Sequence, residues 1–472
     1  MKNAVEMKNI SYSYSSISGE NKVLENINFS LEYGKITLIA GGSGTGKSTL
    51  FYIMNGVIPN NYSGSLSGEV FVCGENTKGK SIGEISRKIA SVFQNAEEQI
   101  IQKYVEDEIA FSLENLGKSQ EKTKESIDFY TNLLNLNKQD ITLSLSGGQK
   151  QRLVTASALA LENDIIILDE PLANLDKKSA NILMQTLSKL KEQGKAICII
   201  EHRLDMVIDY ADIVYNLENS KLFIEENKEK FLSKHITKLD DICPKFNGTE
   251  ALLDIKDIAY KNIINNINLT INKGERLLIL GDNGSGKTTA TKIIARLLKQ
   301  SSGDIFQNID KKLGTKKASK KWFKKLSYVF QNPNYQLFMP TVEDELLFAC
   351  HSTEYAQKIC DMFGLDPLLD CHPHALSQGQ KRKVSVATML AVKPEVIILD
   401  EPTVGQDYES LKTLVNNINT IHTEEKNTVI TITHDIRCAE ALCDKAIVIE
   451  NGKIVKIGGK ELTKKYLSNK IN

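Results

Sequence analysis

Two glycine-rich stretches of this chain have the residue types and the spacing that suit phosphate binding. In both, consecutive backbone N–H groups can surround phosphate oxygens, a lysine can reach the terminal phosphates, and a final hydroxyl group can bind Mg²⁺. Both match the pattern G-x-x-x-x-G-K-[ST], and the second begins 240 residues after the first: Gly41-Gly42-Ser43-Gly44-Thr45-Gly46-Lys47-Ser48 and Gly281-Asp282-Asn283-Gly284-Ser285-Gly286-Lys287-Thr288. With Thr49 and Thr289, which follow directly, they predict two nucleotide-binding sites.

The segments around each pattern support this interpretation. An apolar run precedes each stretch, Ile36–Ala40 in the first case and Leu277–Leu280 in the second, and we expect helices to begin at Ser48 and Thr288. The pattern requires a strand, a tight loop and a helix, because the positive end of the helix faces the phosphate. The alternative is a glycine-rich turn that binds nothing, and the repetition of the whole context argues against it.

Other polar residues recur in the same order in both halves, which indicates an internal repeat. Each half has a strand that ends in glutamine, a Leu-Ser-x-Gly-Gln string, an aliphatic run that ends in Asp-Glu, and a strand that ends at histidine. This recurrence argues against isolated ion pairs and against a simple core histidine. The residues are Gln94, Ser146-Gly147-Gly148-Gln149, Asp169-Glu170 and His202, and then Gln331, Ser377-Gln378-Gly379-Gln380, Asp400-Glu401 and His434.

The aliphatic runs before the two Asp-Glu pairs predict the fold class. Ile165–Leu168 and Val396–Leu399 are apolar throughout, which is typical of a parallel strand whose two faces are both covered by helices. A chain of 472 residues also exceeds a single hydrophobic core. We therefore expect two α/β domains at residues 1–228 and 251–472, joined by a polar linker at 229–250.

The composition excludes several classes of protein. The 59 basic and 59 acidic residues give a formal net charge of +0, so nucleic acid is not an expected partner. No stretch approaches the ~18–20 uninterrupted apolar residues of a membrane span. The polar N-terminus lacks a signal-peptide core, and the eight cysteines contain no C-x-x-C pair, which fits reduced thiols in a cytosol. The lysine-rich stretch 311–325 is expected to be a solvated loop rather than a contact for anionic lipid or nucleic acid.

The ordered set of motifs, present twice, resembles the ATP-binding cassette (ABC) family over nearly the whole chain. The resemblance implies tandem P-loop NTPase domains of the α/β class. Each would have a parallel-sheet core, an antiparallel β subdomain and a helical signature subdomain. The chain also resembles, more specifically, the ATPase components of energy-coupling-factor importers, which take up vitamins and transition metals. The residues that carry this similarity are Asn95-Ala96-Glu97-Glu98-Gln99, Asn332-Pro333-Asn334-Tyr335-Gln336, the Val-Glu-Asp-Glu strings at 105–108 and 342–345, Glu201-His202-Arg203 and Pro402–Asp407.

The resemblance also implies a role for each motif. ATP would lie between the P-loop of one domain and the signature of the other, so two composite sites would form within one chain. Glu170 and Glu401 would orient and deprotonate the attacking water, and His202 and His434 would contact the γ-phosphate. Mg²⁺ and ATP would be the cofactors, and the Mg²⁺ ligands would be Ser48, Gln94 and Asp169 in one site and Thr288, Gln331 and Asp400 in the other.

Two aromatic residues and one departure from the family pattern complete this interpretation. Tyr14 and Tyr260 would stack on adenine, although an aromatic residue in an early strand can instead belong to the core. Gln378 replaces the third-position glycine of the signature, where a side chain could crowd the phosphate. In the family's pairing Gln378 would face the Lys47 site and Gly148 the Lys287 site. We therefore expect both sites to hydrolyse ATP at different rates.

The implied function is to energise an importer from the cytoplasmic side of the cell membrane. Transmembrane subunits would dock near Gln94–Gln99 and Gln331–Gln336, with a small substrate-binding membrane subunit beside them. Glu97, Glu98 and the two Glu-Asp-Glu runs would meet basic helices or form a solvated acidic face. The alternatives are a soluble ABC ATPase acting on ribosomes or DNA, which the neutral charge and short linker disfavour, and a fused sugar-importer ATPase, which the two intact P-loops disfavour.

Overall fold

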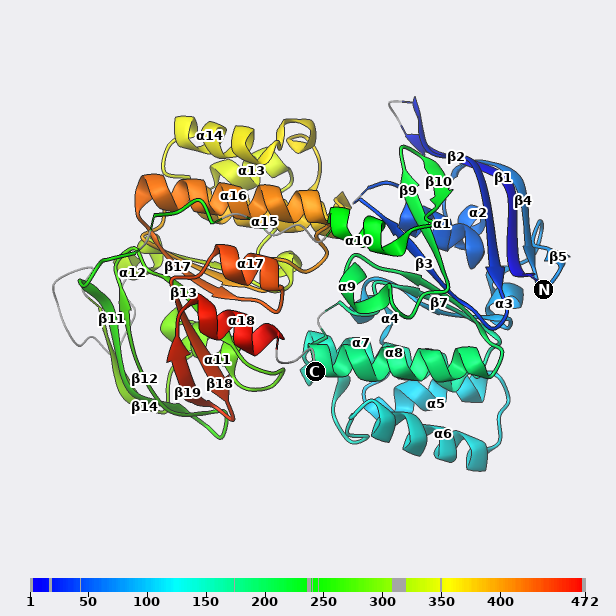
Figure 1. Cartoon of the computed structure of the whole chain (residues 1–472), viewed down its shortest axis with the longest axis horizontal. Coiled ribbons are helices and arrows are strands. Elements are labelled where there is room, and N and C mark those ends of the chain that lie inside the picture. Colours follow the sequence, from blue (N-terminus) through cyan, green and yellow to red (C-terminus); the bar gives the residue numbers. More distant parts are fainter. Residues whose placement is uncertain are drawn as a thin grey trace. The chain divides into compact units, whose positions relative to one another are not determined.

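The chain folds into two compact units, Met1–Thr237 and Lys238–Asn472 (Figure 1). The structure is a computed structural model. It describes residues 3–16, 19–42, 44–173, 175–235, 239, 241–244, 246–307, 320–348 and 350–468.

The first unit contains both strands and helices, which alternate strictly between residues 147 and 218. Its strands are β1 (Asn3–Ser16), β2 (Gly19–Glu32), β3 (Ile36–Gly41), β4 (Gly64–Val72), β5 (Glu75–Asn76), β6 (Ile89–Val92), β7 (Ile165–Asp169), β8 (Ala196–Ile200), β9 (Ile213–Glu218) and β10 (Lys221–Ile224). Its helices are α1 (Lys47–Met54), α2 (Val57–Asn60), α3 (Ile82–Ser86), α4 (Ala96–Gln99), α5 (Val105–Asn115), α6 (Gln120–Leu133), the 3₁₀ turn η1 (Thr142–Ser144), α7 (Gly147–Ala160), α8 (Lys177–Glu192), α9 (Leu204–Val207) and α10 (Lys228–His235).

A six-stranded sheet in the order β10-β9-β3-β8-β7-β6 forms the centre of the first unit. The strands from β9 to β6 pair in parallel, and β10 is antiparallel to β9. Successive residues of β7 face opposite sides, because Ile166 and Leu168 join one core cluster and Ile165 and Ile167 join another. The predicted strand with two buried faces is confirmed.

Different layers cover the two faces of this sheet. One cluster contains residues of α5, α6, α7 and α8, so these helices cover one face. The other cluster contains residues of α1 and of the antiparallel sheet β2-β1-β4-β5. The unit therefore has a parallel-sheet core, an antiparallel β part and a helical part, as predicted for this fold class.

The second unit repeats this arrangement. Its central sheet has the order β15-β16-β17-β13-β18-β19, which matches the first sheet when that sheet is listed from β6 to β10. Its antiparallel sheet consists of β12-β11-β14. Its strands are β11 (Ala251–Tyr260), β12 (Ile264–Asn272), β13 (Arg276–Leu280), β14 (Ser302–Gln307), β15 (Leu326–Val329), β16 (Val396–Asp400), β17 (Thr428–Ile432), β18 (Lys445–Glu450) and β19 (Lys453–Gly458). Its helices are α11 (Lys287–Ile294), α12 (Lys320–Lys325), η2 (Pro333–Tyr335), α13 (Val342–Leu347), α14 (Thr353–Phe363), η3 (Asp366–Leu368), η4 (Pro373–Ala375), α15 (Gln378–Ala391), α16 (Tyr408–Glu425), α17 (Ile436–Ala441) and α18 (Lys460–Ser468).

The described end of the lysine-rich stretch is helical, not a loop. Residues 311–319 lie outside the described residues, but the remainder forms helix α12. Trp322 on this helix is 1% exposed and donates its indole N–H to the backbone oxygen of Ala295 at 3.2 Å. One aromatic residue therefore anchors the end of this stretch in the core, which the lysine content did not indicate.

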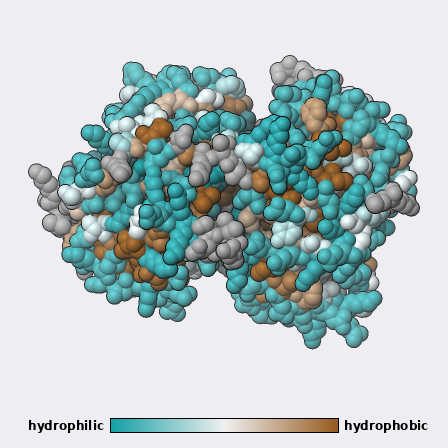
Figure 2. All heavy atoms as spheres, in the orientation of Figure 1, coloured by the Kyte–Doolittle hydropathy of each residue, from teal (hydrophilic) through white to brown (hydrophobic). Residues whose placement is uncertain are grey.

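Most of the surface seen in Figure 2 is hydrophilic, and its hydrophobic residues lie singly or in small groups. This fits a chain in which a quarter of the residues are charged. All eight cysteines are described and none forms a disulfide, in agreement with the predicted reduced thiols.

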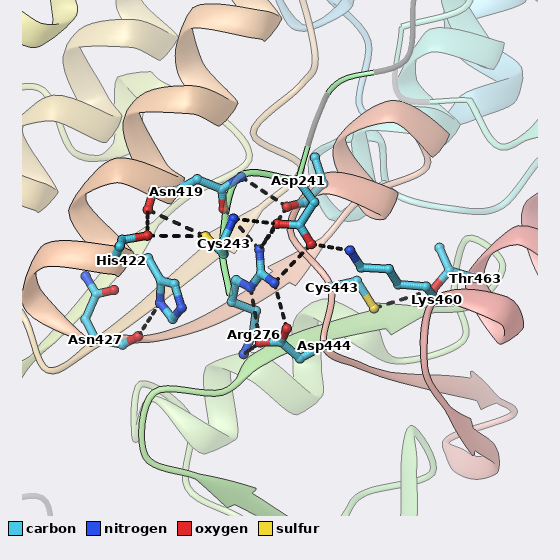
Figure 3. A network of polar contacts seen from close by, with 12 residues as sticks. Asp241, Cys243, Arg276, Asn419, His422, Asn427, Cys443, Asp444, Lys460 and Thr463 are labelled. Atoms are coloured by element: carbon cyan, nitrogen blue, oxygen red, sulfur yellow. Dashed lines mark hydrogen bonds and ion pairs between the residues drawn. The ribbon is translucent and has the colours of Figure 1, made fainter. Parts of the chain in front are cut away.

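A buried arginine connects the segment between the two halves to the second unit (Figure 3). Arg276, at the start of β13, is 1% exposed and lies between two carboxylates. Its guanidinium donates to Asp241 Oδ1 at 2.6 Å and to Asp444 Oδ1 at 2.6 Å, and Lys460 also contacts Asp241. The first half has Ile36 at the corresponding start of β3, so this connection belongs to the second unit only.

We expect Asp241→Asn to destabilise the second unit by about 1–2 kcal/mol at pH 7, because a charged hydrogen-bond acceptor of a buried arginine is lost near solvent. Burial opposes ionisation of Asp241, but hydrogen bonds from Arg276 and Lys460 outweigh it and lower the pKa. A depressed pKa stabilises the fold above the unfolded-state pKa, and this stabilisation is lost as the pH falls below about 4. The difference between wild type and variant should therefore shrink in acid.

Urea unfolding followed by Trp322 fluorescence measures this effect, since the chain has one tryptophan and it lies in the second unit. A matched control is Glu424→Gln, which breaks an exposed ion pair with Lys358 in the same unit. Its effect should stay below about 0.5 kcal/mol. A pH-independent difference between Asp241→Asn and wild type would contradict the assignment.

Candidate active site

The first P-loop runs from the end of β3 to the start of α1. Gly41, Gly44 and Gly46 have φ angles of 147°, 77° and 104°, which residues with a side chain rarely adopt. A Cβ atom on Gly41 would lie 2.4 Å from the backbone oxygen of Leu217, so the loop also needs glycine for space. Gly46 is the N-cap of α1, and the free N–H groups of this helix end can bind an anion. Ser43 lies outside the described residues.

The second P-loop, between β13 and α11, has the same backbone. Gly281, Gly284 and Gly286 have φ angles of 155°, 81° and 103°, close to their counterparts in the first loop. A Cβ atom on Gly281 would lie 2.4 Å from the backbone oxygen of Ile449. The two loops are therefore built alike, although Asp282 and Asn283 replace smaller residues.

The P-loop lysines lie within their own loops. Lys47 Nζ donates to the backbone oxygens of Gly41 at 3.0 Å and Gly42 at 2.6 Å. Lys287 Nζ makes the corresponding contacts with residues 281 and 282, at 3.0 and 2.9 Å. Phosphate oxygens can replace these neutral acceptors and form stronger, charge-assisted hydrogen bonds.

Five predicted site residues of the first half meet at the carboxyl end of β7. Ser48 Oγ donates to Asp169 Oδ2 at 3.0 Å. Gln94 Nε2 donates to Glu170 Oε1 at 2.8 Å, and His202 Nε2 lies 3.2 Å from the same oxygen. Residues that are far apart in the sequence thus form one polar cluster beside the P-loop.

This cluster fits a divalent cation. Asp169 is 2% exposed, and among the described residues no hydrogen-bond donor contacts its Oδ1 atom. A buried carboxylate oxygen without a donor is costly unless a ligand satisfies it. Carboxylate and hydroxyl oxygens are also the ligands that Mg²⁺ prefers, so Asp169 and Ser48 together can hold this ion.

The acidic pair of the first half consists of two carboxyl groups with different pKa values. Burial, and then the charge of Glu170, raise the pKa of Asp169 to about 7. Burial also opposes ionisation of Glu170, but its hydrogen bond and charge interaction with His202 outweigh that and lower its pKa. Glu170 is thus the carboxylate that can accept a proton from water. Its φ angle of 51° is uncommon for a residue with a side chain, and such conformations cluster at functional sites.

The second half has a similar cluster at the end of β16. Thr288 Oγ1 donates to Asp400 Oδ1 at 3.2 Å, and His434 Nε2 lies 3.4 Å from Glu401 Oε1. The φ angle of Glu401 is 50°, as at Glu170. Gln331 follows β15, where Gln94 follows β6 in the first half.

Tyr328 distinguishes the second cluster and was not predicted. Its hydroxyl group donates to Asp400 Oδ2 at 3.0 Å and lies 3.0 Å from Thr291 Oγ1. The matching residue on β6 is Ser91, three positions before Gln94. Burial raises the pKa of Asp400, and then hydrogen bonds from Tyr328 and Thr288 oppose this effect.

The signature residues form the first turns of two helices. Ser146 and Ser377 are the N-caps of α7 and α15, and each completes a capping box with the glutamine three residues later, Gln149 or Gln380. Gln378 is the first residue of α15 and therefore corresponds to Gly147. Free N–H groups at both helix ends can bind phosphate oxygens.

The two tyrosines predicted to contact adenine occupy different positions. The Tyr14 hydroxyl group lies 3.1 Å from Thr49 Oγ1, directly beside the P-loop. The Tyr14 ring lies edge-on to the rings of Tyr12 and Tyr62. Tyr260 pairs with Ile264 on the neighbouring strand, as Tyr12 pairs with Leu24. The strand register therefore places Tyr260 at the position of Tyr12, because β11 ends before reaching the position of Tyr14.

The loops predicted to dock a partner are held by buried glutamates. Glu108 accepts hydrogen bonds from the backbone N–H groups of residues 101 and 102, at 2.9 and 2.7 Å, and Glu345 does the same for residues 338 and 339. Both are 6% exposed. The Glu-Asp-Glu runs were predicted to meet a basic partner or to form a solvated acidic face, and neither alternative holds for these two buried residues, which bind backbone N–H groups of the preceding loop. Glu97 pairs with Lys150 at 2.7 Å.

The chain was compared with known proteins by sequence. The family model described as "ABC transporter" matches residues 24–173 and 264–404, one match in each half. A Clostridium perfringens protein named "Putative ABC transporter ATP-binding protein" is 32% identical over 512 residues, covering 95% of this chain and 89% of that protein. A Bacillus subtilis protein named "Putative HMP/thiamine import ATP-binding protein" is 33% identical over 494 residues, covering 94% and 89%.

Solved structures agree with the fold. A chain titled "RNase-L Inhibitor" has a TM-score of 0.66 at 19% identity and covers 98% of this chain and 92% of its own. A chain from a "Model of ribosome-bound archaeal Pelota and ABCE1" has a TM-score of 0.72 at 18% identity and covers 98% and 80%. At these identities the likeness concerns the fold alone. No helix in the described part of this chain is long and apolar enough to span a membrane.

Proposed function

The chain belongs to the ABC transporter family of ATP-binding proteins and carries two copies of its ATPase domain, and we propose that it is the ATP-hydrolysing subunit of an importer of the energy-coupling-factor type. It would act at the cytoplasmic side of the cell membrane and energise uptake of a vitamin or a metal ion through membrane subunits. The observation that carries the ATP-hydrolysing part of the proposal is the pair of clusters, each with a P-loop hydroxyl group, an acidic pair and a histidine.

The chemistry of each site follows from its geometry. We assign Mg²⁺ to Ser48, Gln94 and Asp169 in the first site, and to Thr288, Gln331 and Asp400 in the second. The ion would neutralise phosphate charge when bound. Glu170 and Glu401 orient and deprotonate the attacking water, because each is held beside a histidine at 3.2 or 3.4 Å.

The remaining motifs complete the two sites. We propose that each P-loop pairs with the signature of the other half, which gives two composite sites within one chain. The signature helix ends then offer N–H donors to the terminal phosphate, and His202 and His434 contact the same group. Tyr14 supplies an aromatic face for adenine next to Thr49. Tyr260 is the candidate for the second site, although its register is that of Tyr12.

The importer assignment rests on the relatives and on the loops after Gln94 and Gln331. The Bacillus subtilis relative is named for HMP and thiamine import and aligns with nearly all of this chain. The first loop exposes Ile101 (70%), and the second exposes Tyr335 (68%) and Phe338 (63%). Phe348 (62%), at the C-terminal end of α13, packs edge-on against Phe338 with their ring centroids 5.2 Å apart. Exposed aromatic groups suit burial against a partner helix. A ribosomal role has the support of fold likeness alone.

Phe338→Ser combined with Phe348→Ser is expected to lower recovery of the membrane partner by about tenfold or more, since two exposed aromatic contacts would be lost. The tagged chain is purified from its native membrane in mild detergent, and the accompanying proteins are identified and quantified by mass spectrometry. ATP turnover of the purified variant should equal that of wild type, because neither residue belongs to a P-loop, an acidic pair, a signature or a histidine position.

Phe129→Ser is the matched control, since Phe129 is 60% exposed on α6 and lies outside the proposed docking loops. It should leave recovery unchanged. Recovery of ribosomal proteins or nucleic acid without a polytopic membrane protein would overturn the transport assignment while leaving the ATPase intact. Equal recovery with both variants would move the docking surface elsewhere.

A further inference from the structure

Two charged residues beside the histidine of the first half contact a second functional segment. Glu201 and Arg203 flank His202 just after β8. They contact Leu172 and Leu175 in the segment that follows Glu170 and leads into α8. We call residues 171–176 the first D-loop, of which residue 174 lies outside the described residues, and residues 402–407 the second D-loop. Neither Glu201 nor Arg203 has a role in binding ATP or Mg²⁺ in the account above.

The carboxylate of Glu201 joins the histidine to the first D-loop. Its Oε2 atom accepts the backbone N–H of His202 at 2.7 Å and that of Arg203 at 3.2 Å. Its Oε1 atom accepts the backbone N–H of Leu172 at 3.1 Å. Glu201 is 3% exposed, and a carboxylate so buried is retained only with hydrogen bonds of this kind.

Arg203 makes the complementary contacts. Its NH1 atom donates to the backbone oxygen of Leu172 at 3.1 Å and to that of Leu175 at 2.9 Å. Both leucine side chains are buried, at 0% and 2% exposure. The two residues on either side of His202 therefore hold the N–H group of Leu172 and the C=O groups of Leu172 and Leu175, so a movement of the histidine backbone can be transmitted to the first D-loop.

The second half connects the same two segments through a single pair of hydroxyl groups and adds a different contact. Thr433 and Asp435 stand at the positions of Glu201 and Arg203. The Thr433 hydroxyl lies 3.1 Å from that of Thr403, and Asp435 caps α17. Gln406, at the position of Leu175, donates its amide to the backbone oxygen of Gly379 at 3.0 Å. The second D-loop thus has one hydroxyl contact with the segment of His434, and it is also connected to the signature helix α15 of its own half.

We propose that Glu201 and Arg203 are positioning residues that couple His202 to the first D-loop, whereas Gln406 couples the second D-loop to the signature helix. This inference rests on the proposed function in one respect, because His202 must report the presence of the γ-phosphate. The two ATP sites would then differ in the contacts that hold their D-loops, in addition to the difference in hydrolysis rate expected from Gln378. Arg203 acts through backbone groups and touches neither ATP nor the water.

Amide hydrogen exchange of the full-length chain tests the proposal, with peptides that cover the two D-loops and with ATP and Mg²⁺ present or absent. In wild type, ATP with Mg²⁺ should slow exchange in both D-loops. Arg203→Met should speed exchange in the first D-loop by about tenfold or more, since two hydrogen bonds are lost, and leave the second D-loop unchanged. It should also lower kcat without changing KM for ATP. Arg203→Lys, which keeps the charge, should restore part of the protection.

Arg296→Met is the matched control, because Arg296 is a partly buried arginine that donates to one backbone oxygen, that of Ile305, away from both D-loops. Its D-loop exchange should equal that of wild type. The inference would be overturned if Arg203→Met hydrolysed ATP and its first D-loop exchanged at the wild-type rate, or if exchange changed equally in both D-loops. Absence of ATP hydrolysis and of ATP-dependent protection in wild type would instead overturn the proposed function.

Discussion

Replacing both Glu170 and Glu401 with glutamine is expected to lower the rate of ATP hydrolysis by about a hundredfold to a thousandfold. Each glutamate lies beside a histidine and next to a buried aspartate, and we propose that it takes the proton from the attacking water. General-base catalysis contributes about 10²–10⁴-fold, and glutamine keeps the shape of the side chain without its basicity. ATP affinity should remain, because neither side chain belongs to a P-loop. Steady-state phosphate release and equilibrium ATP binding measure the two effects.

The single variants test the expected difference between the sites. Gln378 corresponds to Gly147, and Tyr328 contacts Asp400 where the first half has Ser91. We therefore expect Glu170→Gln and Glu401→Gln to retain different residual turnover. Equal residual turnover in the two would contradict the asymmetry, and full turnover in the double variant would contradict the assignment of the glutamates. Glu424→Gln, on an exposed ion pair far from the acidic pair in sequence, is the control.

Replacing Lys47 or Lys287 with methionine is expected to weaken ATP binding at its own site by about tenfold to a hundredfold. A charge-assisted hydrogen bond contributes about 1.5–3 kcal/mol, and each lysine lies in a loop that we propose binds phosphate through backbone N–H groups as well. Isothermal titration calorimetry with ATP and Mg²⁺ measures the affinity. The exposed Lys124 on α6 offers the control Lys124→Met. Unchanged affinity in Lys47→Met and in Lys287→Met would contradict the assignment of the P-loops.

Most of the fold could be predicted because its signals are local. The glycine positions of a P-loop follow from backbone angles that only glycine adopts easily, and the observed φ values of Gly41 and Gly281 agree. The apolar runs before Asp169 and Asp400 indicated buried parallel strands, which the sheets confirm. The repeat of ordered motifs indicated two units of the same topology.

The parts that could not be predicted depend on which residues meet in three dimensions. Tyr328 reaches Asp400 only because β15 and β16 are neighbours. Arg203 follows β8 and the first D-loop follows β7, so the two meet only because these strands are neighbours in the sheet. Sequence spacing alone also could not show that β11 ends before the position of Tyr14.

Surface and buried acidic residues were also indistinguishable in the sequence. Glu106 and Glu108 belong to the same Glu-Asp-Glu run, yet Glu108 is buried and binds backbone N–H groups of the preceding loop. Helical periodicity places these two residues on different faces of α5. The Glu-Asp-Glu pattern therefore correctly indicated the start of a helix, but it did not show which of its carboxylates a partner could reach.

The most direct test of two ATP-hydrolysing sites in one chain is the number of ATP molecules that the Glu170→Gln, Glu401→Gln double variant retains. The protein is incubated with radiolabelled ATP and Mg²⁺, and the bound nucleotide is counted after rapid gel filtration. The account predicts two nucleotides per chain, one for each P-loop, and one after the further change Lys47→Met or Lys287→Met. Retention of a single nucleotide by the double variant, or loss of both with either lysine change, would contradict two independent P-loop sites.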